Sequence, residues 1–143
     1  MSPWRRRPTL EAIAVMAPGT MVEHLDIRFT DIGEDSITAT MPVDARTHTP
    51  FRHLHGGASV ALAETLGSVA ANFCTDEDHY AVGVEVNANH VRSVGEGRVT
   101  GTVTPIHVGR RTQVWETRIA DAGGRLLCIS RLTVAVVPRK PGG

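Results

Sequence analysis

The stretch His55–Ser68 reads HGGASVALAETLGS and predicts a helix that is apolar around nearly its whole circumference. On to Phe73, large apolar residues occur on every side of the predicted helix, with alanines between them. A helix of this composition is normally enclosed by other structure instead of lying on a surface. We therefore expect a long central helix over Gly57–Phe73, wrapped by the rest of the chain.

One carboxylate, that of Glu64, interrupts this apolar segment. An ionised carboxylate taken out of water must be paired, hydrogen-bonded or neutralised, so its presence indicates a function. Helical spacing places Glu64 on one stripe of small residues, made up of Gly57, Ala61, Ser68 and Ala71. The stripe leaves room for a ligand beside Glu64, and the Ser68 hydroxyl is one turn away from the carboxylate.

Two glycines, Gly56 and Gly57, open the helix directly after His55. The first backbone N–H groups of a helix have no internal partner and attract an oxygen that carries negative charge. Glycine also lets a ligand approach the backbone closely. A carbonyl polarised by these N–H groups, with a carboxylate two turns along, suits acyl transfer.

The rest of the chain predicts one antiparallel sheet. A short helix capped by Thr9 ends at Pro18-Gly19, and alternating apolar residues predict strands over 25–30, 37–41, 82–91, 98–108, 112–119 and 126–137. Short turns between the last four strands indicate hairpins. One apolar helix with such a sheet gives an α+β fold, in which the sheet curls around the helix.

Length and composition limit the function. The 143 residues form a single domain, with residues 1–8 and 139–143 expected as flexible tails. Fifteen basic and fifteen acidic residues cancel, which gives no electrostatic case for binding nucleic acid or a membrane surface. One long helix cannot cover both faces of the sheet, so we expect self-association.

The cysteines and the N-terminus indicate a cytoplasmic protein. Cys74 and Cys128 lie in apolar contexts and fit no metal-ligand spacing, which favours buried thiols in a reducing compartment. The chain has no apolar run of membrane-spanning length, and its N-terminus lacks the apolar core of a signal peptide.

Several histidines and serines could carry other chemistry. The spacing of His48, His53 and His55 relative to Glu64 matches no familiar zinc site. Neither Ser59 nor Ser68 lies in a strand-turn-helix elbow, which argues against a serine nucleophile. His90 shares a strand face with apolar residues, so a core histidine and a pocket histidine remain equal alternatives.

Three arginines and one tryptophan are further candidates for a role in binding or in packing. Arg92, Arg110 and Arg111 are solvated strand ends by default. If the substrate carries phosphates, Arg110 and Arg111 form the best local cationic pair. Trp115 is expected to pack in the sheet.

Two sequence blocks are specific: HGGASVALAETLGS at 55–68 and EVNANHVRS at 85–93. Through these blocks, and over nearly its full length, the chain resembles the hotdog-fold acyl-CoA thioesterases. It is similar to the bacterial group that contains the 1,4-dihydroxy-2-naphthoyl-CoA and enterobactin proofreading thioesterases, and the naphthoate-pathway enzyme looks closer. The hotdog fold of this family agrees with the predicted sheet around a long helix.

The resemblance implies roles for individual residues. Glu64 matches the catalytic carboxylate, which acts as general base or nucleophile. Gly56 matches the residue whose N–H polarises the thioester carbonyl. His55 and Ser68 match residues that position the thioester or water, and His90 matches a histidine of the substrate pocket.

The resemblance also implies partners and one departure. Members form dimers that pair into tetramers, with active sites at the subunit boundary and no metal or other cofactor. Relatives usually carry glutamine where this chain has Thr49, before the Pro-Phe pair. A hydroxyl cannot offer an amide's donor and acceptor together, so positioning by Thr49 is weaker, or His48 or His53 replaces it.

The sequence thus predicts hydrolysis of an acyl-CoA, preferably an aromatic one, to a free acid and CoA, with a place in menaquinone biosynthesis. The predicted substrate-binding residues are Thr49, His90, Arg92, Arg110 and Arg111. Two alternatives stay open: a hotdog hydratase or dehydratase that acts on acyl thioesters, and a non-catalytic module that binds them. Hydrolysis alone would liberate a free thiol.

Overall fold

The computed structural model describes residues 1–141, which form three helices and six strands. The helices are α1 (Leu10–Ala14), α2 (Met21–His24) and α3 (Gly56–Phe73). The strands are β1 (Arg28–Ile32), β2 (Ile37–Pro42), β3 (His79–His90), β4 (Arg98–Val108), β5 (Thr112–Ala120) and β6 (Leu126–Pro138). None of the helices in this range combines the length and the apolar composition needed to cross a membrane.

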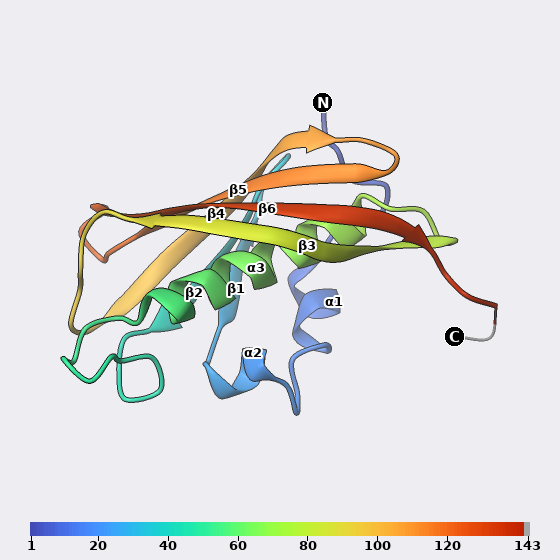
Figure 1. Cartoon of the computed structure of the whole chain (residues 1–143). Helices are drawn as coiled ribbons and strands as arrows, with labels where there is room; N and C mark the ends of the chain where they lie inside the picture. Colours follow the sequence, from blue (N-terminus) through green and yellow to red (C-terminus); the bar gives the residue numbers. More distant parts are fainter. Residues whose placement is uncertain (142–143) are drawn as a thin grey trace.

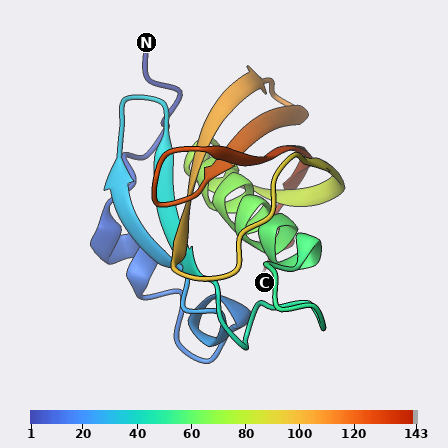
Figure 2. The same ribbon diagram turned by 90° about the vertical axis from the view of Figure 1, so that its left-hand side faces the viewer.

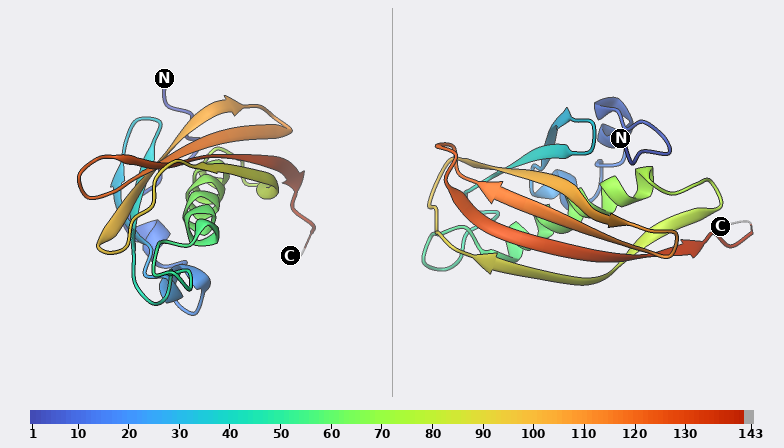
Figure 3. Two further views of the ribbon diagram at one scale, coloured as in Figure 1. Left: turned by 60° about the vertical axis from the view of Figure 1, so that its left-hand side comes forward. Right: turned by 90° about the horizontal axis from the view of Figure 1, so that it is seen from above.

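The six strands form one antiparallel sheet in the order β1-β2-β4-β5-β6-β3. The sheet lies over α3 and curls around it (Figures 1 and 2). Further views show β1 and β2 on one side of the helix and β3 on the other (Figure 3). The predicted α+β fold, with a sheet wrapped around a long helix, is confirmed.

Two of the three predicted hairpins are confirmed. β4 pairs with β5 and β5 with β6, but β3 pairs with β6 at the sheet edge and makes no ladder with β4. The predicted β3–β4 hairpin is therefore wrong. The seven residues between the two strands, 91–97, cross from one sheet edge to the middle, because β4 takes its place beside β2.

The first strand begins later than its apolar alternation predicts. Leu25 and Ile27 are buried, as the pattern requires. Asp26 between them, however, adopts a left-handed φ of 53° that no strand residue has. The segment before it forms the short helix α2, capped by Thr20, which the sequence analysis missed.

α3 packs against the concave face of the sheet through its apolar side, where Leu62 and Leu66 are fully buried. The opposite side of the helix is uncovered, and Glu64 is exposed there. The expected burial of Glu64 is therefore wrong for the single chain. The reason is that the sheet encloses only part of the helix circumference.

The N-terminal segment, expected as a flexible tail, lies against the end of α3. The Trp4 ring stacks on the buried Trp115 ring, with centroids 6.1 Å apart and planes 8° apart. The backbone N–H groups of Arg5 and Arg6 both donate to the Phe73 carbonyl, at 2.9 and 3.2 Å. Of the C-terminal tail, residues 142 and 143 lie outside the described residues.

Both cysteines are free and buried, as the sequence predicts. Burial raises the pKa of the Cys74 thiol to about 12, and burial also raises the pKa of Cys128. Thiols of this kind are almost entirely protonated at neutral pH and react slowly.

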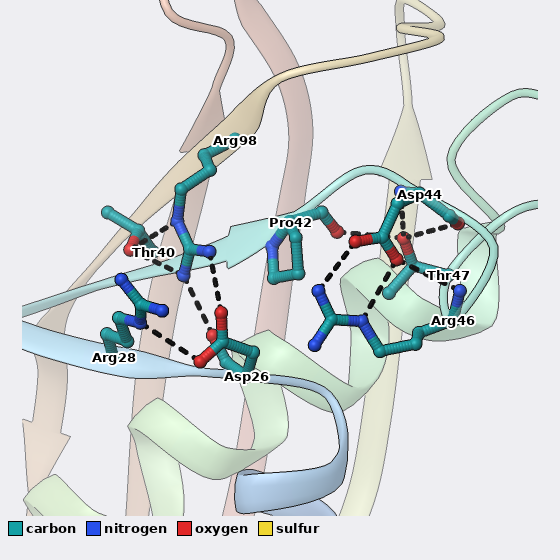
Figure 4. A network of polar contacts seen from close by, with 8 residues as sticks. All are labelled: Asp26, Arg28, Thr40, Pro42, Asp44, Arg46, Thr47 and Arg98. Carbon is teal, nitrogen blue, oxygen red and sulfur yellow. Dashed lines mark hydrogen bonds and ion pairs between the residues drawn. The ribbon is translucent and has the colours of Figure 1, made fainter.

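A polar network joins the start of β1 to β2 and β4 (Figure 4). The Arg98 guanidinium donates to the Asp26 carboxylate at 3.0 Å, to the Asp26 carbonyl at 2.8 Å and to Thr40 Oγ1 at 3.1 Å. Arg28 donates to the same carboxylate at 2.9 Å. Hydrogen bonds from Arg28 and Arg98 lower the pKa of Asp26. The network holds the left-handed turn against the sheet.

The contact between α3 and β4 generates a stability prediction. A Cβ at Gly101 would lie 2.9 Å from Leu66 Cδ1 and 3.2 Å from Leu62 Cδ2, and both leucines are fully buried. We expect Gly101→Val to lower the free energy of unfolding by about 1–3 kcal/mol through overpacking, although valine favours strands. Urea denaturation measures the change.

The control for this variant is Thr100→Val, which introduces the same residue at the next, half-buried position of β4. It should change stability much less, because the side chain keeps its shape. Equal denaturation midpoints for Gly101→Val and the wild type would contradict the close packing of α3 on β4.

The Asp26 network predicts a pH-dependent stability. A carboxylate whose pKa is lowered in the folded state stabilises that state above its unfolded pKa of about 3.9, and this stability is lost as the pH falls. We expect Asp26→Asn to destabilise the protein at pH 7 and to differ less from the wild type near pH 3. Asparagine tolerates the left-handed backbone, so the variant removes mainly the charge. A difference in unfolding free energy that stays constant between these pH values would contradict the prediction.

Candidate active site

The start of α3 offers one free backbone donor. His55 caps the helix, and its Nδ1 accepts the Gly57 N–H at 2.8 Å, while the Ala58 and Ser59 N–H groups donate to the His55 carbonyl. The Gly56 N–H forms no hydrogen bond with any described residue. Of the two glycines that the sequence offers for carbonyl polarisation, Gly56 is therefore the one whose N–H is available.

The hydrogen bond that caps the helix also determines which nitrogen of the His55 ring carries the proton. Because Nδ1 accepts a hydrogen bond, the neutral ring must carry its proton on Nε2. The side chain is exposed, so this Nε2–H can donate to a bound molecule. A doubly protonated ring could not accept the Gly57 N–H and would lose the cap.

The His90 ring lies directly against Gly56. A Cβ built on Gly56 would come within 2.9 Å of His90 Nε2 and 3.2 Å of its Cε1. His90 is exposed, which rules out the core histidine that the sequence left as an alternative. The β3 bulge between Gly83 and Glu85 also breaks the single apolar face on which the sequence places His90. A side chain at position 56 would displace the His90 ring from this position.

A hollow of about 480 Å³ opens beside these residues, and it brings together Gly56, His90 and Arg92. The remaining lining residues were not chosen from the sequence as site residues; they are Leu54, Ser59, Val91, Ser93 and Leu127. Ser59 was weighed only as a nucleophile, although its place in the first helical turn was a signal for lining the site. The hollow thus combines an apolar floor with a few polar groups, which is typical of ligand sites.

Glu64 lies two turns along α3, beside β3. A Cβ on Gly83 would be 3.4 Å from Glu64 Oε1, so a residue without a side chain leaves the space next to the carboxylate open. Glu64 forms no hydrogen bond or ion pair with residues 1–141. The half-buried Ser68 is one turn further on, but no hydrogen bond joins it to Glu64 in this range.

In the loop before α3, Thr49 forms hydrogen bonds with neighbouring residues of the same loop. Its Oγ1 accepts the Phe51 N–H at 3.2 Å, and its backbone pairs with His53. His48 Nε2 lies 2.9 Å from the Gly95 carbonyl oxygen and ties the loop to the β3–β4 crossover. Of the two histidines that could replace the missing glutamine, the exposed His53 is the freer one.

Arg110 and Arg111 lie at the other end of the molecule from Gly56. They line a second hollow, of about 810 Å³, together with Cys74 and Asp76, which follow the last residue of α3. A helix of 18 residues is about 27 Å long, so one chain does not bring these arginines to the Gly56 hollow. No group of metal-binding side chains is arranged to hold an ion among residues 1–141.

Comparison with known proteins assigns this chain to a family. A family model described as the Thioesterase superfamily matches residues 51–128. The 1,4-dihydroxy-2-naphthoyl-CoA hydrolase of Escherichia coli is 58% identical over 134 residues, which cover 94% of this chain and 98% of that protein. The proofreading thioesterase EntH of Cronobacter turicensis is 52% identical over 134 residues, with the same coverage.

A solved structure shows the same fold. The crystal structure of a mutant of thioesterase PA1618 from Pseudomonas aeruginosa has a TM-score of 0.94 and 50% sequence identity, and it covers 96% of this chain and 100% of that chain. The predicted resemblance, including the greater likeness to the naphthoyl-CoA enzyme than to EntH, is confirmed. With its six-stranded sheet around α3, the chain belongs to the Thioesterase superfamily and is a thioester hydrolase of the hotdog fold.

Proposed function

We propose that this thioesterase hydrolyses aromatic acyl-CoA esters to a free acid and CoA, with Glu64 acting on the thioester. The observation that carries the proposal is a Gly56 N–H beside a hollow, on the helix that also presents the Glu64 carboxylate; neither group has a partner among residues 1–141. The 58% identity to 1,4-dihydroxy-2-naphthoyl-CoA hydrolase supports that ester, or another aroyl-CoA, as the substrate. A place in menaquinone biosynthesis stays a prediction tied to this substrate.

The proposed chemistry involves both atoms of the thioester carbonyl group, the oxygen and the carbon. The thioester carbonyl oxygen accepts a hydrogen bond from the Gly56 N–H, and the positive start of α3 stabilises the charge that develops on that oxygen. Glu64 removes a proton from the attacking water, or attacks the carbonyl carbon itself to form an anhydride that water then cleaves. The carbon–sulfur bond breaks and CoA leaves as a thiolate. Neither route consumes a cofactor.

The separation of these groups points to a site shared by two chains. Gly56 and Glu64 are eight residues apart, which is about 12 Å along the helix axis and longer than a glutamate side chain. One carbonyl group cannot contact both within a single chain. β3 is an edge strand and Gly83, beside Glu64, belongs to it. A second copy paired antiparallel along β3 would bring Gly56 of the partner subunit towards Glu64.

The distance to the second hollow supports a phosphate-binding role for Arg110 and Arg111. Cys74, which lines that hollow, is ten residues beyond Glu64, which corresponds to about 15 Å. The pantetheine arm of CoA has about 13 bonds between its sulfur and first phosphorus, and it reaches roughly 15 Å when extended. A thioester at Glu64 therefore allows the CoA phosphates to reach these arginines.

The remaining assignments are parts of the same proposal. His90 and Arg92 line the hollow beside Gly56 and would contact the substrate there. His55, Ser68 and Thr49 would position the thioester or water. A dimer of dimers and a cytoplasmic location stay predictions, the second supported by two free cysteines.

Replacing the carboxylate tests the mechanism. We expect Glu64→Gln and Glu64→Ala to lower kcat on benzoyl-CoA by about 10²–10⁴-fold or more, because general-base or nucleophilic action contributes this much. Release of CoA can be followed with a thiol reagent, since both protein thiols are buried. Glu77→Gln removes an exposed carboxylate outside the site and should leave kcat unchanged.

Near-wild-type turnover by Glu64→Ala would overturn the proposed mechanism. A product that retains the thioester, with no free thiol, would instead indicate a hydratase or dehydratase. Binding of benzoyl-CoA without turnover by the wild type would indicate a binding module.

Blocking the β3 edge tests the shared site. Val84, at the β3 bulge, is 64% exposed. A lysine there should prevent a second copy from pairing along the edge. We expect sedimentation to show an oligomer for the wild type and monomer for Val84→Lys, with kcat falling in parallel. Val15→Lys alters a residue on the far side that is 76% exposed and should change neither property. A fully active monomer would contradict a shared site.

A further inference from the structure

We propose that the N-terminal segment is part of the substrate site, and that the Arg5 guanidinium binds a phosphate of CoA together with Arg110 and Arg111. The inference rests on the proposed function, because the CoA ester supplies the phosphates. It gives a binding role to residues that the sequence alone predicts as a flexible tail.

The hollow at the C-terminal end of α3 carries the inference. Its wall is formed by the N-terminal segment, the residues after α3, the β4–β5 turn and the end of β6. The charged side chains that line it are those of Arg5, Arg110, Arg111 and Asp76, and the His79 ring also lines it. Its volume of about 810 Å³ exceeds the 480 Å³ of the hollow beside Gly56, and it is large enough for the nucleotide end of CoA.

The N-terminal segment is fixed in place by its neighbours, and this fixes Arg5. Trp4 stacks on Trp115, and its Nε1–H donates to the Gly33 carbonyl at 3.4 Å. The Arg6 guanidinium donates to the Asn72 carbonyl at 3.0 Å and lies over the Phe73 ring. The side chains of Trp4 and Arg6 therefore pack against the rest of the protein, whereas the side chain of Arg5 lines the hollow.

The three lining guanidinium groups are free to bind an anion. Within residues 1–141, the side chains of Arg5, Arg110 and Arg111 form no hydrogen bond or ion pair. The one lining carboxylate, Asp76, lies 2.6 Å from His79 Nδ1. The whole chain has a net charge of zero, so this excess of positive charge is local. A guanidinium can donate two parallel hydrogen bonds to one phosphate. A cluster of three guanidinium groups is therefore suited to bind a ligand with several phosphates.

The number of cations favours CoA over a carrier protein as the donor of the acyl group. CoA carries a pyrophosphate and a 3′-phosphate, whereas the prosthetic arm of an acyl carrier protein carries one phosphate and no nucleotide. Three guanidinium groups around a hollow of nucleotide size match the first ligand.

Substrates with and without the nucleotide test the inference. We expect Arg5→Gln to raise KM for benzoyl-CoA about tenfold, with kcat changed by less than about twofold, because uniform binding is lost. KM for S-benzoyl-pantetheine, which has no phosphate, should not change. Arg7→Gln is the matched control: it removes the same charge from an exposed neighbour that does not line the hollow. Arg5→Lys keeps the charge but loses the paired hydrogen bonds, so its KM should lie between those of the wild type and Arg5→Gln.

Binding of the nucleotide alone separates this inference from the proposed function. We expect calorimetry to show adenosine 3′,5′-bisphosphate binding about tenfold more weakly to Arg5→Gln than to Arg7→Gln. A wild type that binds the bisphosphate but does not hydrolyse benzoyl-CoA would overturn the proposed function and leave the Arg5 site standing. Equal KM and affinity in the two variants, or a KM that rises equally for S-benzoyl-pantetheine, would overturn the role of Arg5.

Discussion

The structure depends on the close contact between α3 and the concave face of the sheet. Leu62 and Leu66 are fully buried there, and Gly101 lets the helix approach β4. This contact fixes the direction of the helix, and with it the positions of both helix ends relative to the sheet. Each end then lies next to a different hollow, so the packing of one helix sets the distance between the two hollows.

Local patterns predicted most elements, because each depends on residues close in sequence. The Thr9 cap, the glycines at 56 and 57 and the β4–β5–β6 hairpins are of this kind. The place of β3 at the sheet edge was mispredicted, since strand order depends on contacts far apart in the chain. Asp26 was missed for a similar reason: Arg98, 72 residues away, holds its left-handed turn.

The sequence predicted which residues form the candidate site better than it predicted how these residues are arranged in space. Gly56 and His90 do meet, but the contact of a ring on a glycine depends on β3 lying beside the helix start. The burial expected for Glu64 assumed that one chain encloses the helix. An apolar sequence predicts that the surface of a helix is buried, but it does not predict whether the same chain or a second chain buries it. The exposed side of α3 and the edge of β3 lie together at Gly83, where an identical chain could cover both.

The two ends of α3 also differ in the chemistry they allow. The N-terminal end of a helix attracts negative charge, and the Gly56 N–H, unpaired among residues 1–141, fits the proposed polarisation of a carbonyl. The C-terminal end is negative and by itself repels a phosphate. The proposed anion site there needs cations: the N-terminal segment supplies Arg5 and the β4–β5 turn supplies Arg110 and Arg111, while the backbone N–H groups of Arg5 and Arg6 satisfy the Phe73 carbonyl. The segment that satisfies the last carbonyl of the helix therefore also places one of the three arginines beside that end, which a tail free in solvent could not do.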